Sequence, residues 1–153
     1  MKKALIITYY WPPSGGSGVQ RWLKFAKYLP EFNWEPIIYT PENPDMSIQD
    51  ADLSNDVSAN LKVIKRPIIE PYALGRLLGG KVAQNTGVVS HSKSLKHQLS
   101  LWVRGNCFIP DPRVWWVAPS VRFLKSYIEK EGIELIVTTG PPHSMHLIGL
   151  KLK

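Results

Sequence analysis

Residues 4–18 have the sequence ALIITYYWPPSGGSG, and this stretch determines the fold class. Its first four residues form an unbroken apolar run, which is typical of a β-strand that is covered on both faces. Residues 9–18 follow and are rich in proline and glycine, which predicts a loop. The glycines at 15, 16 and 18 allow backbone N–H groups to approach a ligand closely. The stretch therefore predicts a buried strand that leads directly into a candidate binding loop.

A helix and a second strand complete the unit that begins here. After the loop, apolar residues recur at helical spacing, with polar and basic residues on the opposite face. The apolar set is Val19, Trp22, Leu23, Ala26 and Leu29. Pro30 ends this helix, and residues 35–40 predict a second strand. A strand, a crossover helix and a strand form a βαβ unit, which requires a parallel sheet.

The remaining pattern extends this unit into a single domain over residues 1–153. The expected elements are a polar loop over 41–60, a strand over 61–64, helices over 71–85 and 93–104, turns over 106–113, a helix over 117–128, a strand over 135–137 and a helix from 143. Gly132 is the expected C-terminal cap of the 117–128 helix. The prediction is an α/β fold: a Rossmann-like, open, mainly parallel sheet with helices on both faces.

The last helical pattern has no stop signal. It runs to Lys153 without a glycine, a proline or a polar tail, which are the usual marks of a helix end. We therefore expect the chain to be a piece of a longer protein.

The net charge of +7 predicts an anionic partner or surface. Nucleic acid, a membrane face and phosphorylated small molecules all qualify. We expect no nucleic-acid partner, because the sequence contains no RNA-binding signature, helix-turn-helix or zinc finger. No stretch approaches the roughly 18 apolar residues that span a bilayer. A single cysteine, Cys107, fits a reducing compartment, so we expect a cytoplasmic protein.

Ligands of such a sheet bind beyond the carboxyl ends of its strands, where strand order reverses. Three loops leave from those ends: residues 9–18, 40–60 and 138–144. The glycine loop does not match the dinucleotide fingerprint, because Gly16-Ser17-Gly18 is followed by Val19-Gln20-Arg21. It also lacks the Gly-Lys-Ser/Thr of a P-loop. A common NAD-dependent dehydrogenase and a P-loop ATPase are therefore set aside.

Metal and hydrolase motifs are weak in this sequence. Asp50-Ala51-Asp52 spells the Asp-x-Asp of some metal-dependent transferases, but no predicted strand precedes it to hold it. His143 and His146 lie on one helix face, yet a zinc site needs at least a third ligand. No G-x-S-x-G elbow is present. We expect no metal, no cofactor and no hydrolase chemistry.

The sequence contains six tryptophans. Trp22 and Trp34 fit core positions. Trp115 and Trp116 lie where a loop meets a helix, so they either stack on a sugar ring beside a cleft or anchor the start of the helix. The sequence leaves these two alternatives open.

Three segments resemble family 4 glycosyltransferases of the GT-B fold. The opening is YYWPPSGGSGVQR at residues 9–21, and it is the most specific of the three. FIPDPRVWW at 108–116 and TTGPPHS at 138–144 are similar to segments of bacterial members. The resemblance covers residues 1–40 well and the rest of the chain loosely.

The resemblance implies a protein of two Rossmann-like domains that face each other across a cleft. The amino-terminal domain, which this chain resembles, receives the acceptor. The carboxy-terminal domain binds the nucleotide sugar with a paired-glutamate motif that this chain lacks, so the chain alone is expected to be inactive. Such enzymes usually retain the anomeric configuration and need no metal ion.

The resemblance also implies roles for individual residues. Gly16, Ser17 and Gly18 are expected to face the donor diphosphate. The expected acceptor contacts are Gln20, Asp111, Arg113, Trp115, Thr139 and Ser144. Several relatives carry a histidine at the end of the strand before the last loop, where this chain has Thr138-Thr139. His143, a few residues later, is the candidate catalytic residue.

The expected function is thus transfer of a sugar from a nucleotide-sugar donor to a glycan or lipid-linked acceptor. The alternative is a nonenzymatic Rossmann-like module that binds a nucleotide or another phosphorylated ligand. Leucines, Trp102 and basic residues within 71–105 are typical of an interfacial helix. We therefore expect a peripheral location on the inner face of the membrane, with a helix packed on the sheet as the alternative for this region.

Overall fold

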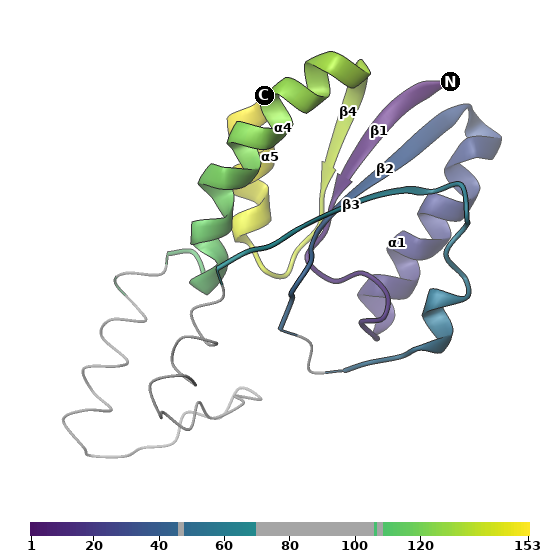
Figure 1. Ribbon diagram of the computed structural model, residues 1–153, viewed down its shortest axis with the longest axis horizontal. Helices are drawn as coiled ribbons and strands as arrows, with labels where there is room; N and C mark the ends of the chain where they lie inside the picture. Colours follow the sequence, from purple (N-terminus) through teal and green to yellow (C-terminus); the bar gives the residue numbers. More distant parts are fainter. Residues whose placement is uncertain (46–47, 70–105, 107–108) are drawn as a thin grey trace.

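A computed structural model describes residues 1–45, 48–69, 106 and 109–153 (Figure 1). Four strands form one open sheet in which every pairing is parallel, in the order β3-β2-β1-β4. The strands are β1 (Lys2–Ile7), β2 (Trp34–Pro41), β3 (Lys62–Arg66) and β4 (Ile133–Thr138). The predicted α/β fold with a parallel sheet is confirmed. The helices expected over 71–85 and 93–104, the basic residues among them and Cys107 lie outside the described residues.

Helices cover both faces of the sheet, as predicted (Figure 1). One face carries α1 (Ser17–Tyr28), and the other carries α4 (Val117–Glu131) and α5 (Ser144–Leu152). Short 3-10 helices complete the described chain: η1 (Leu29–Phe32), η2 (Asp52–Ser54) and η3 (Pro112–Trp116). In the part of the chain that the structure describes, no helix is long and apolar enough to cross a bilayer.

The apolar run of β1 is buried because it packs on both sides. Leu5 and Ile7 belong to the core cluster beneath α4 and α5, whereas Ile6 belongs to the cluster beneath α1. The alternation follows from the two-residue period of a strand. Each of these side chains is 0% exposed. β1 is therefore the centre of the domain.

Two turns use backbone conformations that suit glycine. Gly132 ends α4 with φ 65° in the left-handed region, so its predicted capping role is confirmed. Gly16 precedes α1 with φ 110°, a value that side-chain-bearing residues rarely adopt. This second position lies in the candidate binding loop.

The tryptophans are distributed differently from the prediction. Trp22 and Trp34 are only half-buried, whereas Trp11 and Trp116 are in the core. Trp116 stacks on Tyr39, with ring centroids 5.7 Å apart and an interplanar angle of 9°. Burial raises the pKa of the Tyr39 hydroxyl, which is hydrogen-bonded to Ser120 at 2.9 Å. Trp116 therefore anchors the start of α4, and the exposed member of the pair is Trp115.

An ion cluster ties the end of α4 to two strands. The carboxylate of Glu131 accepts hydrogen bonds from Lys3 of β1 at 3.1 Å and from Lys62 of β3 at 3.0 Å. The hydrogen bonds from Lys62 and Lys3 lower the pKa of Glu131. Lys3 and Lys62 lie at the amino-terminal ends of their strands, opposite the carboxyl ends from which the glycine loop leaves, so the cluster serves the fold.

The two adjacent tryptophans provide a matched test of the core. Trp116→Ala should lower the free energy of unfolding by about 3–5 kcal/mol, because it leaves a large cavity against Tyr39. Trp115→Ala should cost about 1 kcal/mol or less, because that side chain is 45% exposed. Urea unfolding monitored by circular dichroism measures both. Equal losses for the two variants would contradict the assigned packing.

Candidate functional site

At the carboxyl ends of β1 and β4 the strand order of the sheet reverses, although all strands run parallel. The chain passes from β1 through α1 to β2 on one side, and β4 pairs with β1 on the other side. Ile7, the last residue of β1, is paired with Thr138, the last residue of β4. The loops that leave these two strands therefore start side by side (Figure 1). Parallel α/β sheets bind their ligands at such a reversal.

The glycine loop presents backbone rather than side chains at this edge. Gly16 is the N-cap of α1, and no side chain caps the first turn of the helix. A Cβ atom added at Gly16 or at Gly18 would meet nothing within 4 Å. The positions that side chains would occupy at Gly16 and Gly18 are therefore open, at a helix N-terminus, whose N–H groups and dipole favour an anionic group.

Contacts with residues 48–50 hold the loop in place. Asp50 N donates to Pro13 O at 2.8 Å, and Gly15 N donates to Ile48 O at 3.0 Å. A Cβ at Gly15 would lie 2.9 Å from Cγ2 of Ile48, so this glycine allows the two segments to pack closely. The conformation of the glycine loop is thus held by residues 48–50, which belong to the predicted 40–60 loop. Asp50 and Asp52 form a local turn here, in which Asp52 N donates to Asp50 Oδ1 at 3.2 Å.

Trp22 connects α1 to the loop after β4. Its Nε1 donates to Thr139 Oγ1 at 2.6 Å, and Thr139 N donates to Ile7 O at 3.2 Å. These bonds join segments that are more than a hundred residues apart in the chain. Helical spacing alone assigned Trp22 to the core, so the sequence carried no signal for this contact. Thr139 therefore lies between the ends of β1 and β4 and α1, with its hydroxyl already bound to the helix.

His143 and His146 converge above Gly140. A Cβ added at Gly140 would lie 3.0 Å from Nε2 of His146 and 3.3 Å from Nδ1 of His143. The two rings have centroids 5.9 Å apart, and Nδ1 of His146 is 2.9 Å from Thr138 Oγ1. Both imidazoles are exposed at the carboxyl end of β4. The candidate catalytic His143 thus lies at the carboxyl end of β4 beside a second imidazole.

Asp111 and Ser144 are brought together, but as parts of the scaffold. Asp111 Oδ2 accepts from Ser144 N at 2.7 Å, and Oδ1 accepts from Ser144 Oγ at 2.8 Å. Oδ1 also accepts from Arg113 N at 2.9 Å, which caps η3. Ser144 is 0% exposed. These contacts fix the start of α5 against η3, so both residues shape the loop that was expected to contact the acceptor.

Arg113 packs against the exit of β1. Its Cζ lies 5.1 Å from the centre of the Tyr9 ring, and one of its terminal nitrogens lies 3.4 Å from Tyr9 Oη. The same nitrogen is 3.9 Å from Asp45 Oδ2. Arg113 and the exposed Trp115 are therefore presented by η3 next to the strand end where ligands are expected.

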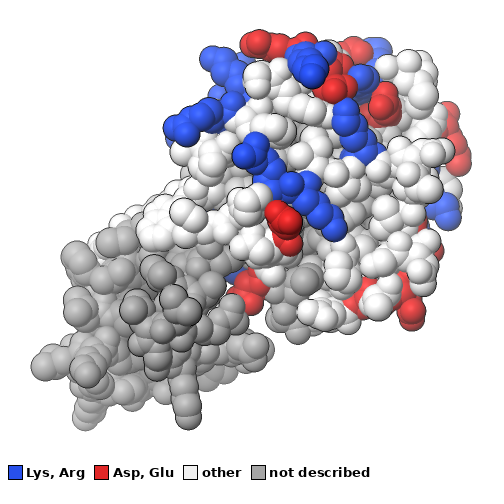
Figure 2. Space-filling model, in the orientation of Figure 1, with Lys and Arg blue, Asp and Glu red and all other residues white. Residues whose placement is uncertain are grey.

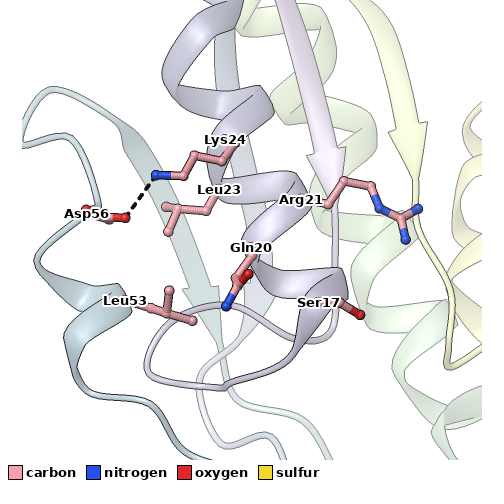
Figure 3. A pocket seen from close by; sticks show the side chains of 7 residues that line it. All are labelled: Ser17, Gln20, Arg21, Leu23, Lys24, Leu53 and Asp56. Carbon is pink, nitrogen blue, oxygen red and sulfur yellow. Dashed lines mark hydrogen bonds and ion pairs between the residues drawn. The ribbon is translucent and has the colours of Figure 1, made fainter.

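Gln20 lies elsewhere. It lines a hollow of about 440 Å³ on the flank of α1 that faces η2, together with Ser17 of the glycine loop, Leu53 and Asp56 (Figure 3). The side chain of Arg21 points the other way, toward the side on which β4 lies (Figure 3). Gln20 therefore lies with Ser17 on the η2 side of the start of α1, whereas His143 and Thr139 lie at the carboxyl end of β4. Arg21 was not singled out from the sequence.

The described residues do not gather their charged side chains or their possible metal ligands in one place. On the face shown in Figure 2, lysine and arginine side chains lie in several separate groups, with acidic side chains among them. Within the described ranges, no group of three or more His, Cys, Asp and Glu side chains is arranged to hold a metal ion. Backbone amides, imidazoles and hydroxyls are thus the chemistry that the described residues offer at the carboxyl ends of β1 and β4.

Comparisons of this chain with protein-family models, with curated proteins and with solved structures give no match.

The scaffold role of Asp111 is testable by unfolding. Asp111→Ala should lower the free energy of unfolding by about 2 kcal/mol or more, because it removes a helix cap and leaves Ser144 N and Oγ without their acceptor. Asp56→Ala is the control: its ion pair with Lys24 is exposed and should contribute about 0.5 kcal/mol or less. Denaturant titration of both variants decides, and an Asp111 variant as stable as the control would contradict the role.

Proposed function

We propose that this chain is the acceptor-side domain of a two-domain glycosyltransferase similar to family 4 enzymes of the GT-B fold. One observation carries the proposal. The glycine loop leads into a helix N-terminus without a side-chain cap, at the end of the sheet where strand order reverses, and it lies beside the loop that bears His143 and Thr139. The resemblance of residues 9–21 to the opening of those enzymes supports it from the sequence. The donor is a nucleotide sugar, and the acceptor is a glycan or a lipid-linked glycan.

The donor side of the proposal rests on the charge of the leaving group. Transfer from a nucleotide sugar builds negative charge on the departing diphosphate, and preorganised N–H groups stabilise such charge. The amides of residues 16–18 can approach the phosphates because Gly16 and Gly18 have open space where a Cβ would lie. A helix N-terminus contributes only about 0.3–1 kcal/mol per charge at an exposed site. The second domain would therefore supply most of the donor affinity.

The acceptor side of the proposal rests on the loop after β4 and on η3. His143 is the group assigned to the acceptor hydroxyl, either to orient it or to take up its proton. Arg113 and Trp115 would contact the sugar of the acceptor from η3, on which Trp115 is 45% exposed. Asp111 and Ser144 would act indirectly, because they fix the position of this wall. The mechanism would be retaining and independent of metal and cofactor.

A nonenzymatic module that binds a phosphorylated ligand is the second candidate. The glycine loop is compatible with it, because backbone N–H groups at a helix N-terminus can contact a phosphate. Such a module would need further contacts for affinity, since the helix N-terminus contributes only about 0.3–1 kcal/mol per charge. The two candidates differ in one outcome. A module of this kind would bind a nucleotide but transfer no sugar, even as the natural polypeptide.

Gly18→Val tests the donor role of the loop. The side chain would project into the space assigned to the diphosphate, so turnover of the natural polypeptide with its nucleotide sugar should fall about tenfold or more. Folding should be unaffected, because Val is at least as good a helix former as Gly and a Cβ at Gly18 meets nothing within 4 Å.

Ser126→Val is the control variant. It places the same side chain at an exposed position of α4, on a different helix from the glycine loop, and should leave turnover unchanged. Release of the nucleoside diphosphate from a panel of nucleotide sugars provides the assay, and the melting temperature checks the fold. Equal turnover in the Gly18 variant and the wild type would remove the loop from the donor site.

A further inference from the structure

The first turn of α5 carries a second imidazole that the proposed mechanism does not use. His146 is exposed at the carboxyl end of β4, and its backbone N–H donates to the carbonyl oxygen of His143 at 3.0 Å. Ser144 and Met145 lie between the two histidines, and both are 0% exposed. The buried pair fixes this turn against the core, so the two exposed rings are held at one end of α5.

Thr138 orients the ring of His146. Its Oγ1 lies 2.9 Å from Nδ1 of His146, which is a hydrogen-bond distance. Thr138 is itself held by α5, because a Cβ added at Gly149 would lie only 2.7 Å from its Cγ2. The hydrogen bond that one ring nitrogen makes sets the protonation of the other nitrogen. With Nδ1 bound to Thr138, Nε2 is the nitrogen of His146 that is left for a ligand.

The position of this Nε2 connects it to the strand end where the glycine loop begins. It lies 3.0 Å from the place that a Cβ of Gly140 would occupy. Gly140 follows Thr139, whose hydroxyl accepts from Trp22 at 2.6 Å and whose N–H donates to Ile7 O at 3.2 Å. The free nitrogen of His146 therefore lies over the residue that leaves the junction of β1, β4 and α1.

His143 lacks comparable support. Within the described ranges its side chain makes no hydrogen bond, and its ring contacts that of His146, with centroids 5.9 Å apart. Its Nδ1 lies 3.3 Å from the Cβ position of Gly140, so both imidazoles present a nitrogen to the same side of the loop. A base works best when a third group fixes its tautomer and orientation. Only His146 has such a group among the described residues.

We propose that His146 is a catalytic residue of the proposed sugar transfer and that Thr138 positions it. This inference rests on the proposed function and divides its acceptor side between two imidazoles. His143 orients the acceptor hydroxyl, and Nε2 of His146 takes up the hydroxyl proton. As the hydroxyl oxygen bonds to the anomeric carbon, the bond from that carbon to the diphosphate breaks and leaves its electron pair on the phosphate oxygen. The Nδ1–H of His146 donates to Thr138 Oγ1 throughout and keeps the ring in place.

Nitrogen NMR of the imidazole rings tests the orientation on the chain itself, without a substrate. At a pH at which the rings are neutral, His146 should carry its proton on Nδ1, because that nitrogen donates to Thr138. Thr138→Val keeps the shape of the side chain and should convert His146 to a mixture of tautomers, whereas Thr138→Ser should restore the single tautomer. His143 is the internal reference and should be a mixture in all three proteins. A His146 protonated on Nε2, or a tautomer that Thr138→Val leaves unchanged, would contradict the proposal.

Turnover of the natural polypeptide tests the chemical role. His146→Gln should lower kcat about hundredfold or more, which is the usual contribution of a positioned base, and should change the KM for the acceptor little. Thr138→Val should lower kcat about tenfold, and Thr138→Ser should recover it. His143→Gln should chiefly raise the KM for the acceptor. Leu150→Gln, at a position of α5 that is 69% exposed, is the control and should act as the wild type does.

The outcomes separate this inference from the proposed function. A wild type that transfers sugar, together with a His146→Gln variant of equal kcat, would overturn the role of His146 alone. A wild type that transfers sugar from none of the nucleotide sugars would remove the proposed function, and the role of His146 with it. The melting temperatures of the variants should match that of the wild type, because both imidazoles are exposed.

Discussion

The burial of β1 on both faces is the constraint on which the rest of the molecule depends. Its apolar residues, Ala4 to Ile7, pack against α1 on one side and against α4 and α5 on the other. The apolar part of the strand therefore has no side chain available for a ligand, and the glycine loop leaves from its carboxyl end. Because β1 lies between β2 and β4, that end is also where the strand order of the sheet reverses. The placement of the glycine loop follows from this topology.

The candidate site is consequently built from backbone at its centre and side chains at its rim. Gly16 has a positive φ and Gly18 has no neighbour at its Cβ position, so the start of α1 is open. The rim comes from three segments that are distant in the chain: α1, η3 and the loop between β4 and α5. Two hydrogen-bond connections hold them in register: Trp22 to Thr139, and Asp111 to Ser144. Under the proposed function, the side chains of the rim would contact the acceptor and the backbone at the centre would face the phosphates.

The sequence was sufficient for local structure and insufficient for contacts across the chain. The apolar run of β1 and the amphipathic pattern of α1 predict their own elements, and Gly132 predicts its left-handed cap, because each depends on neighbouring residues. Trp115 and Trp116 could not be distinguished, since their burial depends on whether Tyr39 lies opposite. Ser144 was expected at the acceptor, but a partner 33 residues away buries it. Gln20 was expected there as well, yet its position on the helix turns it toward η2. The functional roles themselves remain proposals.

The most direct test is a nuclear magnetic resonance titration of this chain with nucleoside diphosphates and their sugar conjugates. The account predicts weak, saturable shifts of the backbone amide signals of Gly16, Ser17 and Gly18, accompanied by Thr139 at the facing loop. Gly132 is the internal reference, because it is another glycine with positive φ and ends α4, in a part of the chain remote from the glycine loop. Unchanged amides at 16–18, or shifts no larger than that of Gly132, would contradict a phosphate site at the start of α1.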